Sequence, residues 1–246
     1  MRLIFSRKGF DSANGGRPSP IVAGRPRSLP IPEAREACTT YADLGLGVLV
    51  EQVTGGRLAG HAGCHDDPMF AGGHCWFGQS GSAQGHLRRQ GVGVGDLFLF
   101  FGLFADEATR ERHHRIYGYL EIAGHAPAGE VRTRPGWREP PRAHPHLSPK
   151  LRPQNTIYFG PGRMARHAPD SLRLTRVGGP ASRWAVPEWL TRTGLSRHGR
   201  ADRWATPGQL ATVAIGQEFV CDIEGNSDAF AWLERTIAAI TQTRLS

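Results

Sequence analysis

Polar residues gather directly after the first apolar run of the sequence. Ser6, Arg7, Lys8 and Asp11 follow residues 3–5, and Lys8 is one of only two lysines among thirty basic residues. A guanidinium, an amine and a carboxylate this close can orient a phosphate, and Lys8 with Asp11 forms a pair able to exchange a proton at short range. A surface ion pair that caps a turn is equally compatible with these residues.

The window from residue 61 to residue 75 is rich in side chains that bind zinc and iron. Its members of this kind are His61, Cys64, His65, Asp66, Asp67, His74 and Cys75. Their spacing matches no zinc-finger, zincin or zinc-deaminase motif, so we assign no metal ligand and predict that His65 and Asp67 form an acid–base pair. Metal-dependent hydrolysis in this window remains an alternative, as does a loop of hydrogen-bonded residues without chemistry.

Two further segments carry side chains suited to binding. The first combines small residues, which permit close backbone approach, with Gln79, Gln84 and His86, and a glutamine amide can pair with the edge of a base. An ordinary glycine-rich loop fits the same spacing, and the P-loop motif is absent. In the second, His144 and His146 are alternate residues of an extended segment, so both imidazoles can face one site.

A pair of strands in the middle of the chain is best placed to position these residues. Residues 97–101 are apolar on both faces, which predicts a strand covered on both sides, and residues 116–122 predict its partner, with aliphatic side chains on one face and tyrosines on the other. Weaker patterns predict further strands at 3–5, 155–159, 172–175 and 217–223, and helices at 46–53 and from residue 226 or 227. Residues 60–95 are expected to be irregular, and residues 126–153 are expected to form an exposed excursion.

Strands outnumber helices, and the two do not alternate as a doubly wound parallel sheet requires. We therefore expect an α+β fold with a curved, mostly antiparallel sheet, peripheral helices and long irregular loops. A single domain is expected over residues 1–246.

The composition favours an anionic partner. The formal net charge is +8 and the pI is about 10.0, values typical of proteins that bind nucleotides or nucleic acid. No run is apolar enough for a membrane span or a signal peptide, so we expect no membrane association and a cytoplasmic location. The four scattered cysteines are expected to be reduced thiols.

Six motifs together resemble the third family of nucleotide-modification-associated domains. They lie at residues 5–11, 18–20, 65–68, 77–87, 90–102 and 216–219, and their order and spacing match nearly the whole chain. The resemblance implies an accessory protein of bacterial or phage gene clusters that hypermodify bases. It also implies that the candidate site consists of the polar residues at the matching positions of this chain: Ser6, Arg7, Lys8, Asp11, His65, Asp67, Gln79, Gln84, His86, His144 and His146. The family pattern has a second acidic residue after its His-x-Asp-Pro motif; Met69 stands there in this chain, which disfavours a two-carboxylate metal site.

The central hairpin is also similar to that of PUA-like barrels such as the ASCH and EVE domains, which cradle single, often modified, nucleobases. Together the resemblances predict a protein that recognises or processes a modified nucleotide or a flipped base. Gln79 and Gln84 are expected at the base edge and Arg7 and Lys8 at phosphate, with Lys8, His65 and Gln79 facing one cavity. A non-catalytic reader of modified DNA is the alternative, so catalysis is left open, and the sequence defines neither a cofactor nor an oligomeric state.

Overall fold

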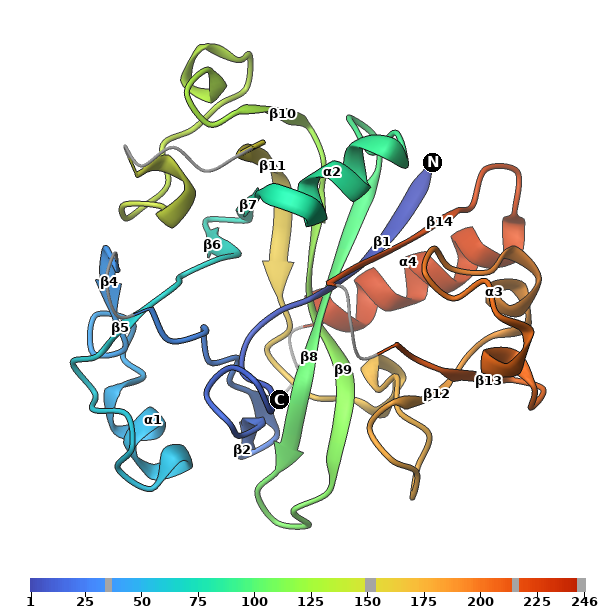
Figure 1. Ribbon diagram of the computed structural model, residues 1–246, viewed down its shortest axis with the longest axis horizontal. Coiled ribbons are helices and arrows are strands. Elements are labelled where there is room, and N and C mark those ends of the chain that lie inside the picture. The colour runs from blue at the N-terminus through green and yellow to red at the C-terminus, as the bar shows by residue number, and fades with distance from the viewer. Residues whose placement is uncertain (34–36, 149–153, 214–216, 243–246) are drawn as a thin grey trace.

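The centre of the fold is a long antiparallel hairpin of β8 (Leu97–Asp106) and β9 (Arg112–Glu121). The computed structural model describes residues 1–33, 37–148, 154–213 and 217–242 (Figure 1). In β8, Leu97, Leu99 and Phe101 are buried in one core, while Phe98 and Phe100 are buried in a second core on the opposite face. The strand is therefore covered on both sides, as its apolar run predicted.

The main sheet extends from this hairpin in both directions, in the order β14-β1-β8-β9-β11-β7-β6. β1 (Arg2–Arg7) runs parallel to β8 and antiparallel to β14 (Glu218–Asp222). Near the end of β8, β2 (Ser19–Val22) pairs with it in parallel and also pairs with β3 (Arg25–Pro26). The other described pairings of this sheet are antiparallel. The predicted α+β fold with a curved, mostly antiparallel sheet is thus confirmed, and the sheet is open.

The sheet turns at β11 (Thr156–Met164), because this strand has different partners along its length. Its first part pairs with β7 (His74–Gln79) and β10 (Gly124–Pro127), whereas its last residues pair with β9. β6 (Met69–Ala71) continues the sheet beyond β7. This arrangement carries β6 and β7 away from the plane of the central hairpin (Figure 1).

The helices cover the sheet from different sides. α4 (Ser227–Thr241), whose Asn226 cap accepts a hydrogen bond from Ala229 N, and α3 (Glu188–Thr193) pack on the face that includes Phe101. α2 (Gly81–Arg89) contributes Leu87 to the opposite core. α1 (Gly47–Thr54) lies at the far flank of the molecule with β4 (Thr39–Thr40) and β5 (Gly63–Cys64) (Figure 1). The predicted helices at 46–53 and after residue 226 are confirmed.

Several shorter elements complete the described chain. They are β12 (Arg183–Ala185) paired with β13 (Gln209–Ala211), and the 3-10 helices η1 (Val131–Thr133), η2 (Pro145–Leu147), η3 (Asp170–Leu172) and η4 (Ala201–Trp204). No helix within the described ranges has the length and apolar character needed to cross a membrane.

Three expectations about local structure need correction. Residues 60–95 are not irregular: they contain β7, in which all six residues are buried, and α2, so the expected glycine-rich loop is a strand end followed by a helix. The strand expected at 172–175 is replaced by η3 and isolated bridges at Arg173 and Thr175. The excursion at 126–153 holds the end of β10, η1 and η2, and its residues 149–153 lie outside the described ranges.

The alternation expected in β9 also fails at one point. β8 pairs Phe100 with Gly118 but Phe101 with Ile116, so Tyr117 is an extra residue in a β-bulge. As a result Ile116 is buried in the core under α4, whereas Tyr117 and Leu120 are buried in the core under α2.

Candidate functional site

Three histidines and one aspartate from distant parts of the chain meet at the end of β7. Asp67 precedes β6, the strand that pairs with β7, and the segment that carries His144 and His146 packs on β7 through η2. His65 Nε2 lies 3.8 Å and His146 Nε2 lies 3.6 Å from Asp67 Oδ2. The structure therefore brings together four of the residues predicted for the site, which we call the His–Asp cluster: His65, Asp67, His144 and His146.

Hydrogen bonds to the outer ring nitrogens define how two of the imidazoles are oriented. His65 Nδ1 lies 2.9 Å from Glu33 Oε2, a carboxylate that can only accept. His146 Nδ1 lies 2.6 Å from Asn155 Oδ1, while Asn155 Nδ2 donates to the His146 carbonyl. Both Nδ1 atoms are therefore donors, and Nε2 of each ring faces Asp67.

The second oxygen of Asp67 is held by different groups. Asp67 Oδ1 accepts a hydrogen bond of 3.0 Å from Gly78 N and lies 3.4 Å from His144 Nε2. His144 Nδ1 accepts from His146 N, so the proton of a neutral His144 is on Nε2, toward the carboxylate. Gly78 is required here, because a Cβ at this position would collide with the His146 ring. Asp67 Oδ1 is thus held in place, and the side chain is only 4% exposed.

Burial and charge give the members of the cluster different protonation states. Burial lowers the pKa of His65, but hydrogen bonds and charges from Asp67 and Glu33 outweigh it and raise the pKa to about 9. Burial lowers the pKa of His146 to about 4, against the opposing charge of Asp67. Burial favours protonated Asp67, yet hydrogen bonds from His144 and His65 hold its pKa far below the ordinary value. Near neutral pH the cluster holds an imidazolium, a neutral imidazole and a carboxylate.

A cleft of about 960 Å³ opens beside the cluster, and Asp67 forms part of its wall. Phe70 and Tyr117, the bulged residue of β9, make the wall partly aromatic. Arginines occupy the rim, where Arg142 donates to Asp66 Oδ2. The other rim arginines are exposed and form no ion pair with the described parts of the chain: Arg25, Arg27 and Arg166. The cleft therefore combines aromatic surface, positive charge and a buried carboxylate.

A second polar group surrounds Lys8 at the end of β1. Lys8 Nζ lies 3.1 Å from Glu218 Oε1 and 4.5 Å from the centre of the Phe77 ring. Gln79 Nε2 donates to the same carboxylate oxygen at 2.6 Å, and Ser6 is paired opposite Glu218 between β1 and β14. Because side chains alternate along a strand, Gln79 and the space filled by His146 at Gly78 lie on opposite faces of β7. Neither Lys8 nor Gln79 lines the described cleft; the neighbouring Gly9 does.

The remaining predicted residues are distributed elsewhere. Arg7 lies over the rings of Phe101 and Phe219, on the face opposite Lys8, and Asp11 caps its own turn through Ala13 N and Asn14 N. Gln84 exchanges two hydrogen bonds with the Tyr158 hydroxyl. His86 Nε2 lies 3.0 Å from Ser196 Oγ. The roles assigned to these residues, and to Ser6, Lys8 and Gln79, stay predictions.

Three residues that organise these clusters were missed from the sequence. Glu33 is 32 residues from His65 in the chain, with no pattern that connects them. Gly78 was interpreted as part of a flexible loop, although it makes room for His146. Glu218 lies in the 216–219 motif, so the family resemblance carried a signal for it. Within the 61–75 window, His61 is exposed and Cys64 is buried in the core of α1.

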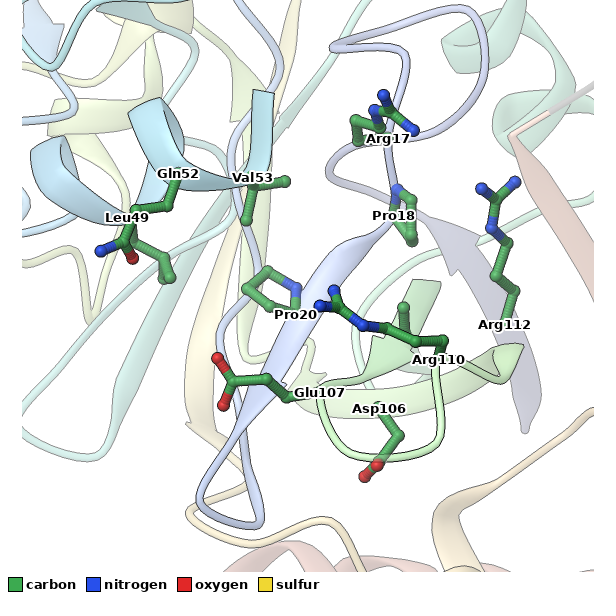
Figure 2. Close-up of a pocket in the computed structure, with 11 residues that line it drawn as sticks. Arg17, Pro18, Pro20, Leu49, Gln52, Val53, Asp106, Glu107, Arg110 and Arg112 are labelled. Carbon is green, nitrogen blue, oxygen red and sulfur yellow. The ribbon is translucent and has the colours of Figure 1, made fainter. Parts of the chain in front are cut away.

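A second hollow, of about 530 Å³, lies between α1 and the turn that joins β8 to β9 (Figure 2). Arg17, Arg110 and Arg112 line it together with Leu49 and Val53 of α1. The residues described along its wall include none of those predicted for the site. It is therefore a separate surface, on which three arginines lie together with Asp106 and Glu107.

Comparison with known proteins links the chain to a family but to no characterised protein. No curated protein and no solved structure matches it significantly. The family model described as nucleotide modification associated domain 3 matches residues 2–222, a range that includes the His–Asp cluster, the cleft and the Lys8 group. The chain therefore belongs to the nucleotide modification associated domain 3 family, and its association with nucleotide modification follows from this membership.

Proposed function

We propose that this protein binds a nucleotide, or a base presented by nucleic acid, in the Asp67 cleft and acts on it with the His–Asp cluster. The observation that carries the proposal is that Asp67, the carboxylate of the buried His–Asp cluster, forms part of the wall of an aromatic cleft with arginines at its rim. Groups with strongly shifted pKa values that line a concave surface are typical of catalytic sites.

The cleft has the size and chemistry that a nucleotide requires. Its volume of about 960 Å³ is at the upper end of the range found for small-molecule sites. Guanidinium groups bind phosphate through two parallel hydrogen bonds, and the arginines of the rim supply them. Phe70 and Tyr117 supply apolar surface against which a planar base can pack.

The His–Asp cluster supports proton transfer. His65 retains a proton near neutral pH and can donate it, since its pKa is about 9. His146 is neutral at the same pH and its Nε2 can accept a proton. A site that holds an acid and a base within a few ångström of one another is suited to general acid–base catalysis on a bound base or sugar.

The test is to incubate the full chain with a panel of unmodified and base-modified nucleosides and nucleoside monophosphates. Calorimetry reports binding, and mass spectrometry of the mixture reports conversion. We expect nucleotides to bind more tightly than nucleosides, with an affinity that falls as salt rises, because phosphate contacts with exposed arginines are screened. A changed product mass indicates processing, whereas binding with unchanged masses indicates the non-catalytic reader.

Two variants and one control locate the ligand. Arg166→Ala is expected to lower nucleotide affinity about tenfold, the effect of losing one charge-assisted hydrogen bond. Asp67→Asn is expected to retain binding and to lose turnover. Arg112→Ala removes an arginine from the separate hollow and is expected to change neither. Equal affinities of the Arg166→Ala and wild-type chains for every nucleotide would contradict the placement of the ligand in the cleft.

A further inference from the structure

We propose that His65 Nε2, Asp67 Oδ2 and His146 Nε2 bind one divalent ion of a first-row transition metal. This inference concerns the same cluster, does not depend on nucleotide binding, and is an alternative to the acid–base role, because an ion occupies the same Nε2 atoms. It is carried by the arrangement of three ligand atoms and by the hydrogen bonds that orient them.

The three atoms are already near the spacing that one ion requires. They lie within 4.8 Å of one another, with both Nε2 atoms 3.6 to 3.8 Å from Asp67 Oδ2. Ligand atoms about 2.0 to 2.2 Å from an ion lie roughly 3.0 to 3.5 Å apart at tetrahedral or octahedral angles. A contraction of a few tenths of an ångström therefore brings each Nε2–Oδ2 distance into this range, and the two Nε2 atoms, which lie within 4.8 Å of each other, must also approach one another. The two rings are nearly perpendicular, at 75°, so they approach the shared point from different directions.

The outer nitrogen of each histidine is held as metal-binding histidines usually are. Glu33 accepts from His65 Nδ1 and Asn155 accepts from His146 Nδ1, so each ring presents Nε2 to the shared point. Such carboxylate and carbonyl partners fix the tautomer and raise the basicity of the ligating nitrogen. An ion takes the place of the second imidazole proton of His65, which is released on binding.

The remaining polar groups fix Asp67 for binding through one oxygen. Gly78 N donates to Oδ1, and His144 Nε2 lies toward the same atom. Oδ2 therefore remains for the ion. His144 is a positioning residue, because its Nδ1 accepts from a backbone amide and its Nε2 carries the proton in the neutral ring.

The donor set selects the class of ion. Two imidazole nitrogens and one carboxylate oxygen suit Zn²⁺, Fe²⁺ and their neighbours, whereas Mg²⁺ and Ca²⁺ favour oxygen ligands alone. Three protein ligands leave coordination positions open, as in catalytic rather than structural sites. Asp67 lines the cleft, so the ion lies at its wall. The spacing motifs for zinc miss this set because His146 follows Asp67 by 79 residues.

The experiment is a titration of the EDTA-treated full chain with Co²⁺, without nucleotide. We expect one equivalent to bind, with visible absorption bands of nitrogen and oxygen ligation, and we expect Zn²⁺, or Fe²⁺ under anaerobic conditions, to displace it. His146→Ala and Asp67→Asn are expected to lower the Co²⁺ affinity at least about 100-fold. His61→Ala is the matched control, since it removes an exposed histidine from the same window and is expected to bind as the wild type does.

A second variant keeps the test decisive where a ligand substitution prevents folding. Asn155→Ala removes only the partner of His146 Nδ1 and is expected to weaken Co²⁺ binding about 10- to 100-fold. Failure of the wild-type chain to bind a stoichiometric ion overturns the inference. So does equal affinity of the wild-type chain and the folded His146→Ala or Asn155→Ala variants. Because nucleotide is absent, either result leaves the nucleotide-binding test unaffected.

Discussion

Lys8 Nζ lies 3.1 Å from Glu218 Oε1, so a lysine at the end of the first strand pairs with a carboxylate 210 residues later in the chain. The two side chains are 11% and 1% exposed, and Gln79 Nε2 donates to the same oxygen. Both residues contact Oε1, whereas Oε2 is buried without a hydrogen-bond partner among the described residues. This pair joins β1 to β14 and stabilises the edge of the sheet.

Replacing Lys8 by methionine keeps an apolar side chain of similar length but removes the ammonium that lies over the Phe77 ring and leaves Glu218 buried without its cation. Removal of one partner of a buried ion pair costs about 3 kcal/mol or more. We expect Lys8→Met to lower the free energy of unfolding by about this amount in urea titrations. We expect the double variant with Glu218→Gln to lose less free energy of unfolding than the two single variants together, by at least about 1 kcal/mol. Strict additivity would show that the pair is not coupled.

Gly78→Ala is expected to disrupt the His–Asp cluster. The new Cβ collides with the His146 ring, which must move away from Asp67. Overpacking of this kind costs about 1 to 3 kcal/mol, measurable as a shift of the urea midpoint. Gly129→Ala is the matched control, because nothing lies within 4 Å of a Cβ at that glycine. Similar stabilities of the two variants would show that His146 has room to adjust.

Two buried serines are expected to respond differently to loss of the hydroxyl. Ser6 Oγ has no hydrogen-bond partner within the described residues, so Ser6→Ala is expected to leave the free energy of unfolding unchanged or to raise it slightly. Ser19 Oγ accepts from Leu29 N, and Ser19→Ala is expected to cost about 1 to 2 kcal/mol because that amide loses its acceptor. A destabilised Ser6→Ala variant would reveal a contact of this hydroxyl.

His114 makes the fold sensitive to acid. Burial, followed by the charges of Arg7 and His113, lowers the pKa of His114 to about 3, and Trp184 Nε1 donates to its Nδ1. In the unfolded chain the ring titrates near 6.5. Between pH 6.5 and 3 the unfolded chain therefore binds a proton that the folded chain does not, so stability falls as the pH falls and is insensitive to this group above 6.5.

The loss due to His114 is about 2 kcal/mol at pH 5. We expect His114→Gln, which retains an acceptor for Trp184, to reduce the difference in urea stability between pH 7.5 and pH 5 by about that amount. The control His61→Gln replaces an exposed ring and is expected to show the same difference in stability between the two pH values as the wild type. An unchanged pH dependence in His114→Gln would mean that other groups account for the acid sensitivity.

The elements that were predicted correctly are those whose burial can be recognised from a short stretch of sequence. Residues 97–101 are apolar at every position because cores lie on both faces, and α4 shows its spacing and its Asn226 cap directly. β7 was missed because glycines at 72, 73 and 78 favour a loop. A glycine is needed at position 78 because the ring of His146, 68 residues later in the chain, fills the space that a Cβ would take. No local sequence pattern contains this contact.

The site was predicted in part for the same reason. His144 and His146 were predicted to share a site, and both lie at Asp67, but residues 145–147 form the 3-10 helix η2 instead of the extended segment on which that prediction rested. Their meeting with His65 depends on the register of β6 against β7, which is set by tertiary packing. Arg7 and Lys8 were grouped because they are adjacent in sequence, but neighbouring strand residues face opposite sides of a sheet.

The extra residue at Tyr117 has a consequence for how this architecture can diversify. The phenol reaches the cleft because one more residue is present in β9 than in the facing stretch of β8, whatever the chemical nature of the side chain at that point. Deleting Tyr117 would restore regular pairing, because Phe100–Gly118 and Phe101–Ile116 already match on either side, and would remove one aromatic side chain from the wall while the flanking residues keep their faces. The lining of the cleft can thus change through the length of one strand, without any change in the segments that carry the His–Asp cluster.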